Sequence, residues 1–182
     1  MFRLTVDSDI ELSLPEHHDA PQLFALIDSN RARLRQWLAW VDGVTSPDSL
    51  SGYISGARAQ WAAEDGYTTL VRYRGELAGS LGQHNLNHTI RAVEMGYWMG
   101  EAFGGQGVMT RASRALIEIA FGRQGLNRVE IRAATGNRPS QAVAERLGFV
   151  REGQIRDGQW LYDHYVDMYV YGMLARDWGA AA

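Results

Sequence analysis

The chain has 182 residues with a formal net charge of -3; its 46% apolar and 21% charged residues are typical of one folded domain and exclude a disordered chain. It has no cysteine, and all 18 basic residues are arginine, so disulfides, cysteine nucleophiles, P-loop lysines and Schiff-base lysines are excluded. No apolar run is long enough to cross a membrane, and the start of the chain lacks the features of a signal peptide. We therefore expect a cytoplasmic protein that binds neither membranes nor nucleic acid.

Taken in chain order, the apolar pattern predicts a strand at 10–14 and helices at 19–30, 31–40 and 46–66. From residue 67 the apolar period becomes two, which predicts strands at 67–73, 76–83 and 90–99. A glycine-rich loop at 100–107 leads into a helix at 108–122; a strand at 127–133, a helix at 137–147 and strands at 149–155 and 160–174 follow. The predicted fold is α/β (α+β): a mixed, mostly antiparallel sheet of about seven strands with helices on both faces, in a single domain over 1–182.

The most specific local signal is the loop Gly104–Gly107 between a predicted strand and a predicted helix. Glycines let backbone N–H groups turn toward one point, and a helix N-terminus adds unpaired donors, so the pattern indicates a phosphate or diphosphate site. The alternative is that these glycines only form a tight connection. A P-loop is excluded without lysine, and Thr110 stands where a dinucleotide-binding fingerprint needs a small residue.

A second segment, Asn137–Phe149, adds an Asn that opens a helix and a Leu-Gly-Phe that closes it. With Phe103–Thr110, Trp37–Trp40 and Glu94–Trp98, it makes the chain resemble the GCN5-related N-acetyltransferase (GNAT) superfamily over about residues 8–176, and within it the Rim-type ribosomal-protein N-alpha-acetyltransferases. The resemblance implies a GNAT-like fold, acetyl-CoA as co-substrate, no metal, and direct acetyl transfer to a primary amine, foremost a protein N-terminal amine. It also gives a hint of a homodimer. The residues that it assigns to acetyl-CoA are Tyr97, Trp98, Met99, Gly104, Gly105, Gln106, Gly107, Val108, Met109, Thr110, Asn137 and Arg146.

Attack of an amine on a thioester needs a base, stabilisation of the oxyanion and a proton for the departing thiolate. Glu101, just past a strand end, and Glu94, on that strand, are the candidate bases. We prefer Glu101, where the resemblance also places the base, and an ion pair with arginine is the alternative for Glu94. Ser140 is the candidate proton donor, because Ala144 replaces the tyrosine usual in the superfamily. The alternative for Ser140 is hydrogen bonding in the first helical turn, although Asn137 is the better-placed N-cap.

The candidate acceptor site consists of aromatic residues and one carboxylate that would receive an ammonium group; core packing is the alternative for the aromatic residues. These residues are Trp37, Trp40, Trp160, Tyr162 and Asp163. The five histidines follow no metal-binding spacing, and we expect them in solvated loops. Two alternative functions remain open: a polyamine or aminoglycoside acetyltransferase, and a non-catalytic acyl-CoA-binding sensor.

Overall fold

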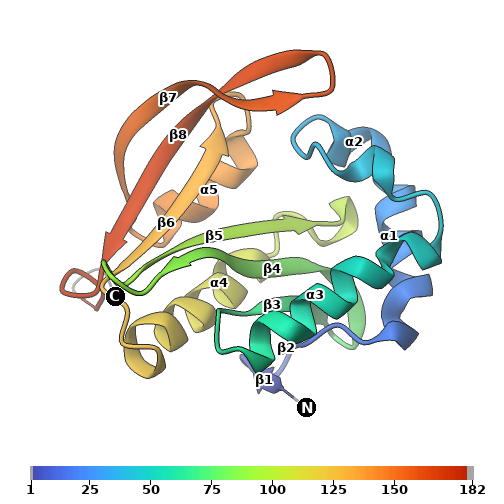
Figure 1. Cartoon of the computed structure of the whole chain (residues 1–182), viewed down its shortest axis with the longest axis horizontal. Coiled ribbons are helices and arrows are strands. Elements are labelled where there is room, and N and C mark those ends of the chain that lie inside the picture. Colours follow the sequence, from blue (N-terminus) through green and yellow to red (C-terminus); the bar gives the residue numbers. More distant parts are fainter. Residues whose placement is uncertain (1, 180–182) are drawn as a thin grey trace. The chain divides into compact units, whose positions relative to one another are not determined.

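The structure is a computed structural model that describes residues 2–179. Within these residues eight strands follow one another across the sheet in the order β1-β2-β3-β4-β5-β6-β8-β7 (Figure 1). The strands are β1 (Arg3–Thr5), β2 (Ile10–Ser13), β3 (Thr68–Tyr73), β4 (Glu76–Asn87), β5 (Ala92–Met99), β6 (Arg128–Ala134), β7 (Val150–Leu161) and β8 (His164–Leu174). The α-helices are α1 (Ala20–Ser29), α2 (Arg31–Arg35), α3 (Ser51–Ala62), α4 (Val108–Glu118) and α5 (Arg138–Arg146).

The chain forms two compact units, each described by itself. The first holds the residues up to 82 together with 97–108, and the second holds 83–96 and the residues from 109 onward. The boundary divides both β4 and β5 between the units. That the chain acts as a single domain therefore stays a prediction. No helix in the described range 2–179 is long and apolar enough to span a membrane.

In the first unit, antiparallel pairing joins β1 to β2, β2 to β3 and β3 to β4. Leu12 lies opposite Val71 in this ladder, and both side chains are fully buried. Helix α3 packs on β3, and a buried apolar cluster that includes Ile27, Ile54 and Leu70 joins helices to sheet. Burial of such side chains is the main stabilising contribution to this unit.

In the second unit, β5 and β6 form a parallel ladder that covers only three residues of each strand, Ala92–Glu94 and Arg128–Glu130. Both strands continue beyond the ladder, β5 to Met99 and β6 to Ala134. Antiparallel pairing joins β6 to β8 and β8 to β7, and α5 contacts β6. The mixed, mostly antiparallel character of the predicted sheet is thus confirmed.

Two strand predictions were wrong in detail. Within residues 2–179 the sheet has eight strands where about seven were predicted, because Arg3–Thr5 pairs with β2 although three residues carry no readable pattern. The strand expected at 149–155 runs on to Leu161 as β7, and the strand expected at 160–174 begins only at His164 as β8, after a turn at Tyr162 and Asp163. Tyr162 adopts a φ of +56°, a conformation uncommon for an aromatic residue, and neither turn residue is glycine or asparagine.

Two helix predictions were also too long. The helix expected at 31–40 ends at Arg35, because the Arg31 guanidinium donates to the carbonyls of Val41 (2.8 Å) and Val44 (2.6 Å) and so holds the following chain back against the helix start. The helix expected at 46–66 begins as a 3-10 turn at Pro47–Leu50, and α3 ends at Ala62. Helix α4 continues as a π-turn over Ile119–Arg123, close to its predicted end.

Candidate functional site

The glycine loop belongs to the first unit and lies between η4 (Glu101–Phe103) and Val108, the first residue of α4. Gly104–Gly107 are exposed, and Gly105 and Gly107 have φ angles of +72° and +70°, which residues with side chains rarely adopt. A Cβ at either position would meet nothing within 4 Å, so the loop surface is open. Because the first N–H groups of a helix have no partner within it, the loop and the helix start fit an anionic diphosphate.

Two side chains of the helical region bind main-chain atoms at the end of β5, just before the glycine loop. Asn30, between α1 and α2, accepts a hydrogen bond from the N–H of Glu101 (2.8 Å). Arg33, on α2, donates through Nη2 to the carbonyl of Met99. The segment 99–101 is therefore fixed through its backbone by the helical part of the same unit.

Gly79, on β4, allows a close approach of β5 to the same strand end. A Cβ at Gly79 would lie 2.2 Å from the carbonyl oxygen of Trp98 and 2.8 Å from Cα of Met99. The N–H of Gly100 donates to the carbonyl of Ala78 at 2.9 Å. This hydrogen bond holds the end of β5 against β4. Any larger residue at position 79 would push the backbone of β5 away.

The two candidate bases have different surroundings. Glu101 is exposed at the start of η4, and within residues 2–179 no hydrogen bond or ion pair reaches its carboxylate. Glu94, in the second unit, accepts a hydrogen bond from Asn85 (3.1 Å) and lies 3.8 Å from Nε of Arg132. The ion pair considered as the alternative for Glu94 is thus present, whereas Glu101 retains the lone pairs that a base needs.

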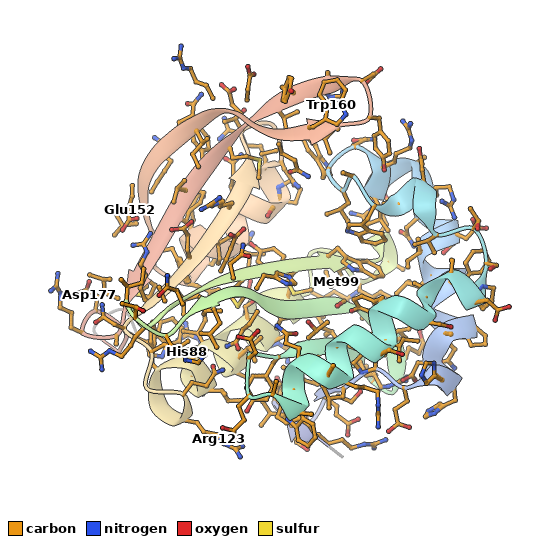
Figure 2. The ribbon with its side chains drawn as sticks, in the orientation of Figure 1. His88, Met99, Arg123, Glu152, Trp160 and Asp177 are labelled. Carbon is orange, nitrogen blue, oxygen red and sulfur yellow. The ribbon has the colours of Figure 1, made fainter. Side chains whose placement is uncertain are left out.

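Beside Glu94, a cluster of ion pairs crosses the strands of the second unit. Arg128 donates to Glu152 at 2.8 and 2.6 Å and to Glu130 at 2.8 Å, and Arg132 donates to Glu130 at 2.7 Å. The Arg128 hydrogen bonds lower the pKa of Glu152. Burial raises the pKa of Glu130, but the hydrogen bonds from Arg128 and Arg132 outweigh it, and the net pKa is lowered. Figure 2 labels Glu152 near one end of β7 and Trp160 near the other.

Asn137 and Ser140 lie at the start of α5 in the second unit. Asn137 is the N-cap, and its Oδ1 accepts the N–H of Ser140 at 3.2 Å, which confirms the predicted cap. Ser140 is half-buried, while Val143, Ala144 and Leu147 of the same stripe are buried. The Ser140 side chain thus stands at the edge of the buried stripe.

The other residues assigned to acetyl-CoA divide between the units. Val108 and Met109, at the start of α4, are buried, and Thr110 is half-buried. Gln106 is exposed, and its side-chain amide donates to the carbonyl of Ala102 at 3.1 Å. This side chain therefore stabilises the glycine loop from within. The first unit contains Trp37, Trp40, Tyr97, Trp98, Met99, Glu101, Gly104, Gly105, Gln106, Gly107 and Val108; the second contains Glu94, Met109, Thr110, Asn137, Ser140, Arg146, Trp160, Tyr162 and Asp163.

Two of the aromatic candidates, Trp40 and Trp160, each contact another aromatic ring within their own unit. In the first unit the Trp40 ring lies 5.8 Å from that of Trp98 and is 41% exposed, so it is not a core residue. In the second, Trp160 contacts Tyr165 with ring centroids 4.7 Å apart; Tyr165 is exposed and was not predicted, because its strand pattern alone did not distinguish it. Asp163 pairs with His164 at 2.7 Å in the turn.

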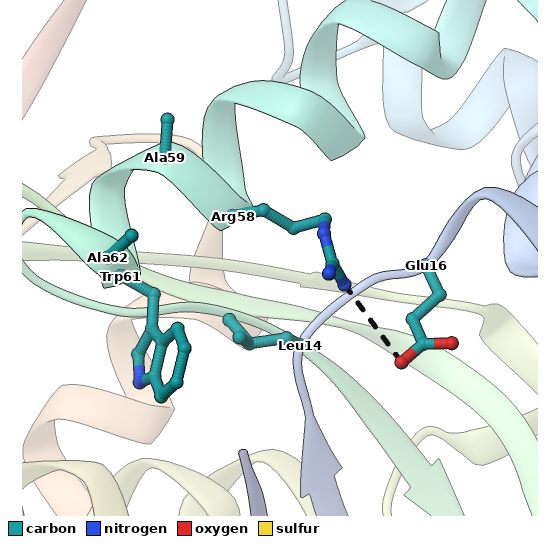
Figure 3. A pocket seen from close by; sticks show the side chains of 6 residues that line it. All are labelled: Leu14, Glu16, Arg58, Ala59, Trp61 and Ala62. Carbon is teal, nitrogen blue, oxygen red and sulfur yellow. Dashed lines mark ion pairs between the residues drawn. The ribbon is translucent and has the colours of Figure 1, made fainter. Parts of the chain in front are cut away.

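A cavity of about 480 Å³ lies elsewhere in the first unit and contains none of the predicted residues. Trp61 and Arg58 of α3 line it together with Leu14 and Glu16, and the Arg58 guanidinium lies 3.9 Å from the Glu16 carboxylate (Figure 3). No spacing in the sequence indicated it. It offers one weak ion pair beside apolar walls and no nucleophile.

All five histidines are exposed, as predicted, but the expected loop holds only for His88: His84 lies within β4, His164 is the first residue of β8, and His17 and His18 belong to a 3-10 turn at His17–Asp19. The His84 imidazole packs against β5, because a Cβ at Gly96 would lie 3.3 Å from its Nε2. Within residues 2–179 no group of three or more His, Asp or Glu side chains is arranged to hold a metal ion.

Comparison of the fold with solved structures identifies the class. The ribosomal L7/L12 alpha-N-protein acetyltransferase RimL, solved in complex with coenzyme A, superposes with a TM-score of 0.91 at 28% identity, over 95% of this chain and 98% of that one. The fold is therefore that of an acetyltransferase. A model described as an acetyltransferase (GNAT) domain matches residues 9–150, so the chain belongs to the GNAT acetyltransferase family.

Two curated relatives extend over nearly the whole chain. "Putative ribosomal N-acetyltransferase YdaF" of Bacillus subtilis (strain 168) is 40% identical over 98% of this chain and 98% of its own. The ribosomal-protein-serine acetyltransferase of Escherichia coli (strain K12) is 29% identical over 94% and 96%. The chain is thus an acetyl-CoA-dependent N-acetyltransferase, as its sequence predicted.

Proposed function

We propose that this enzyme transfers the acetyl group of acetyl-CoA directly to the N-terminal α-amine of a protein, foremost a ribosomal protein. The exposed loop Gly104–Gly107, with two residues at positive φ, carries the proposal, because its open main chain leads into the start of α4. Its relatives named as ribosomal N-acetyltransferases, from Bacillus subtilis and Escherichia coli, support the choice of acceptor.

In this proposal, main-chain amides of Gly104–Thr110 bind the diphosphate of acetyl-CoA. The strand Tyr97–Met99 pairs with the pantetheine arm of acetyl-CoA as an added strand would. Asn137 and Arg146 are included among the acetyl-CoA contacts because of the resemblance to the family. The short parallel ladder between β5 and β6 supports the strand assignment, because β5 continues for five residues beyond Glu94. Asn30 and Arg33 keep this strand end in place.

The chemistry needs no covalent enzyme intermediate. Acetyl-CoA supplies the thioester; the carboxylate of Glu101 is proposed to take a proton from the acceptor ammonium, with Glu94 in reserve. The Ser140 hydroxyl is proposed to donate a proton to the departing thiolate. Asn137 positions Ser140, because it binds the Ser140 N–H. Replacement of Ser140 by alanine would then lower kcat more than acetyl-CoA affinity.

The proposed acceptor contacts are Trp37 and Trp40 in the first unit and Trp160, Tyr162 and Asp163 in the second. Exposed aromatic rings give apolar contact area with few rotatable bonds, which suits an extended peptide. Trp40 and Trp160, 41% and 49% exposed, have the surface for this role. The Asp163 carboxylate, although it pairs with His164, is proposed to attract the terminal ammonium.

The test is acetyl-CoA binding followed by turnover. Acetyl-CoA should raise the melting temperature of the wild type, and a Gly107→Val variant should lose that increase because a side chain there strains and covers the loop. Gly125→Val is the matched control: its φ of +64° is similar, its Cβ also meets nothing within 4 Å, and it lies outside the loop. Retention of the increase by Gly107→Val would refute the loop assignment.

Coenzyme A release with a panel of amines then identifies the acceptor. Turnover with peptides that carry a free N-terminal serine, and little with spermidine or kanamycin, is the expected result. Preference for the small amines would refute the protein acceptor, and binding without any turnover would indicate a sensor. Sedimentation of the same sample checks the proposed homodimer.

A further inference from the structure

The cavity beside α3 is a part of the first unit that the proposed function does not use. One side of it is a face of α3, where Arg58, Trp61 and Ala62 share a side of the helix because they lie three and four residues apart. The other side is the chain that follows β2, through Leu14 and Glu16. In Figure 3 the Trp61 indole lies beside Leu14, and the Arg58 side chain extends from α3 toward Glu16. The cavity thus has an apolar part and a charged part within one compact unit.

The apolar part suits a flat aromatic body. Leu14 is buried, whereas the Trp61 side chain beside it is 38% exposed. Covering an open indole with another apolar group removes both surfaces from water, which is favourable. Ala59 and Ala62, which also line the cavity, are too short to fill it. Its volume of about 480 Å³ lies within the range of about 300–1,000 Å³ that is usual for small-molecule sites.

The charged part favours a negative group on the ligand. Within residues 2–179 the Arg58 guanidinium, which carries five N–H donors, makes only the 3.9 Å contact with Glu16. The Glu16 carboxylate is also paired with His18 at 3.1 Å and is 22% exposed, against 49% for Arg58. Asp19, next to His18, is buried and is neutralised by Arg72 at 2.6 Å. Arg58 is therefore the group that retains donors, and a planar carboxylate matches two of them at once.

We propose that this cavity is a second binding site of the enzyme, for a small aromatic carboxylic acid. The carboxylate of the acid accepts hydrogen bonds from the Arg58 guanidinium, and its ring lies against Trp61 and Leu14. None of the residues that line the site belongs to the set assigned to acetyl-CoA or to the acceptor amine. Because the acid contacts α3 and the chain after β2 together, its binding stabilises the folded first unit by mass action.

The first experiment measures the melting temperature with indole-3-acetate and with its neutral analogue indole-3-acetamide. At about ten times its Kd, indole-3-acetate should raise the melting temperature of the wild type by about 3 °C, and the amide at the same concentration should change it little. Arg58→Gln should weaken the binding of indole-3-acetate about tenfold, because a charged hydrogen-bond donor is lost. Both Arg58 and the control residue below are exposed, so both variants should fold as the wild type does.

Arg74→Gln is the matched control. The Arg74 guanidinium also lies beside a carboxylate, that of Asp9 at 3.3 Å, and over an aromatic ring, that of Tyr73 at 5.0 Å, but it does not line the cavity. This variant should bind indole-3-acetate as the wild type does. Equal binding of the amide, or equal weakening by Arg58→Gln and Arg74→Gln, would overturn the proposal.

NMR signals of the tryptophan indole N–H groups locate the ligand. The Trp61 signal, identified by its absence in Trp61→Phe, should move when indole-3-acetate is added to the wild type and to Arg74→Gln. At the same concentration it should move less in Arg58→Gln. Movement of other tryptophan signals without that of Trp61 would place the ligand elsewhere and overturn the proposal. Acetyl-CoA should raise the melting temperature of Arg58→Gln as much as that of the wild type, and a loss of this increase would contradict the separation of the two sites.

Discussion

The end of β5 in the first unit and the ion-pair cluster in the second are both held by arginine, but in different ways. At the strand end, Arg33 and Asn30 bind main-chain atoms of Met99 and Glu101. In the cluster, the bonds of the Arg128 guanidinium to residues that the structure describes all go to side-chain carboxylates. Main-chain contacts fix the path of the chain, whereas side-chain ion pairs rearrange when one partner moves. Substitutions should therefore cost more at the strand end than in the cluster.

The largest loss of stability is expected for Gly79→Ala, which disturbs the end of β5. The new Cβ would lie 2.2 Å from a main-chain oxygen, which cannot rotate away, so the free energy of unfolding should fall by about 3 kcal/mol. Urea unfolding measures this change. The matched control is Gly56→Ala within α3, where a Cβ meets nothing within 4 Å and stability should rise by about 0.5 kcal/mol. Equal stability of Gly79→Ala and the wild type would contradict the argument.

The cluster should tolerate a similar overlap. A Cβ in Gly172→Ala would lie 2.3 Å from Oε1 of Glu152 and 2.5 Å from Nη1 of Arg128, but both atoms end flexible side chains. The unfolding free energy should fall by only about 1 kcal/mol, the upper range for an exposed ion pair. The difference from the wild type should shrink in 1 M salt, where such pairs are screened. A loss as large as that of Gly79→Ala would remove the contrast between the two regions.

The smallest change in the free energy of unfolding is expected for a substitution of Ser113, which belongs to neither region. Its hydroxyl is fully buried in α4 and has no hydrogen-bond partner among the described residues. Ser113→Ala removes this unsatisfied group and improves helix propensity, so the unfolding free energy should rise by about 0.5 kcal/mol. Thermal unfolding of the variant measures it. A clear loss of stability would show that the hydroxyl has a partner.

The features that the sequence predicted well depend on local chemistry. The turn formed by the loop Gly104–Gly107 and the cap at Asn137 were predicted, because glycine and asparagine favour these conformations wherever they occur. The family followed from the same segments. The catalytic assignments to Glu101 and Ser140 remain predictions.

The features that the sequence missed depend on distant partners. Helix α2 stops at Arg35 because Arg31 binds carbonyls ten and more residues away, which no periodicity records. The turn at Tyr162 lacks the usual turn residues and is fixed by the pairing of β7 with β8. His84 lies in a strand because β4 runs to Asn87, four residues beyond the predicted end of that strand at Gln83.

The two functions of the Asn30 side chain have a mechanical consequence. Its Nδ2 donates to the carbonyl of Leu26 at 2.9 Å, in the last turn of α1, while its Oδ1 accepts the N–H of Glu101. A single planar amide thus ties the helix end and the start of η4 together. Because one rigid amide makes both bonds, a displacement of the end of α1 would move the backbone of Glu101 in the same direction, and no flexible linker lies between the two.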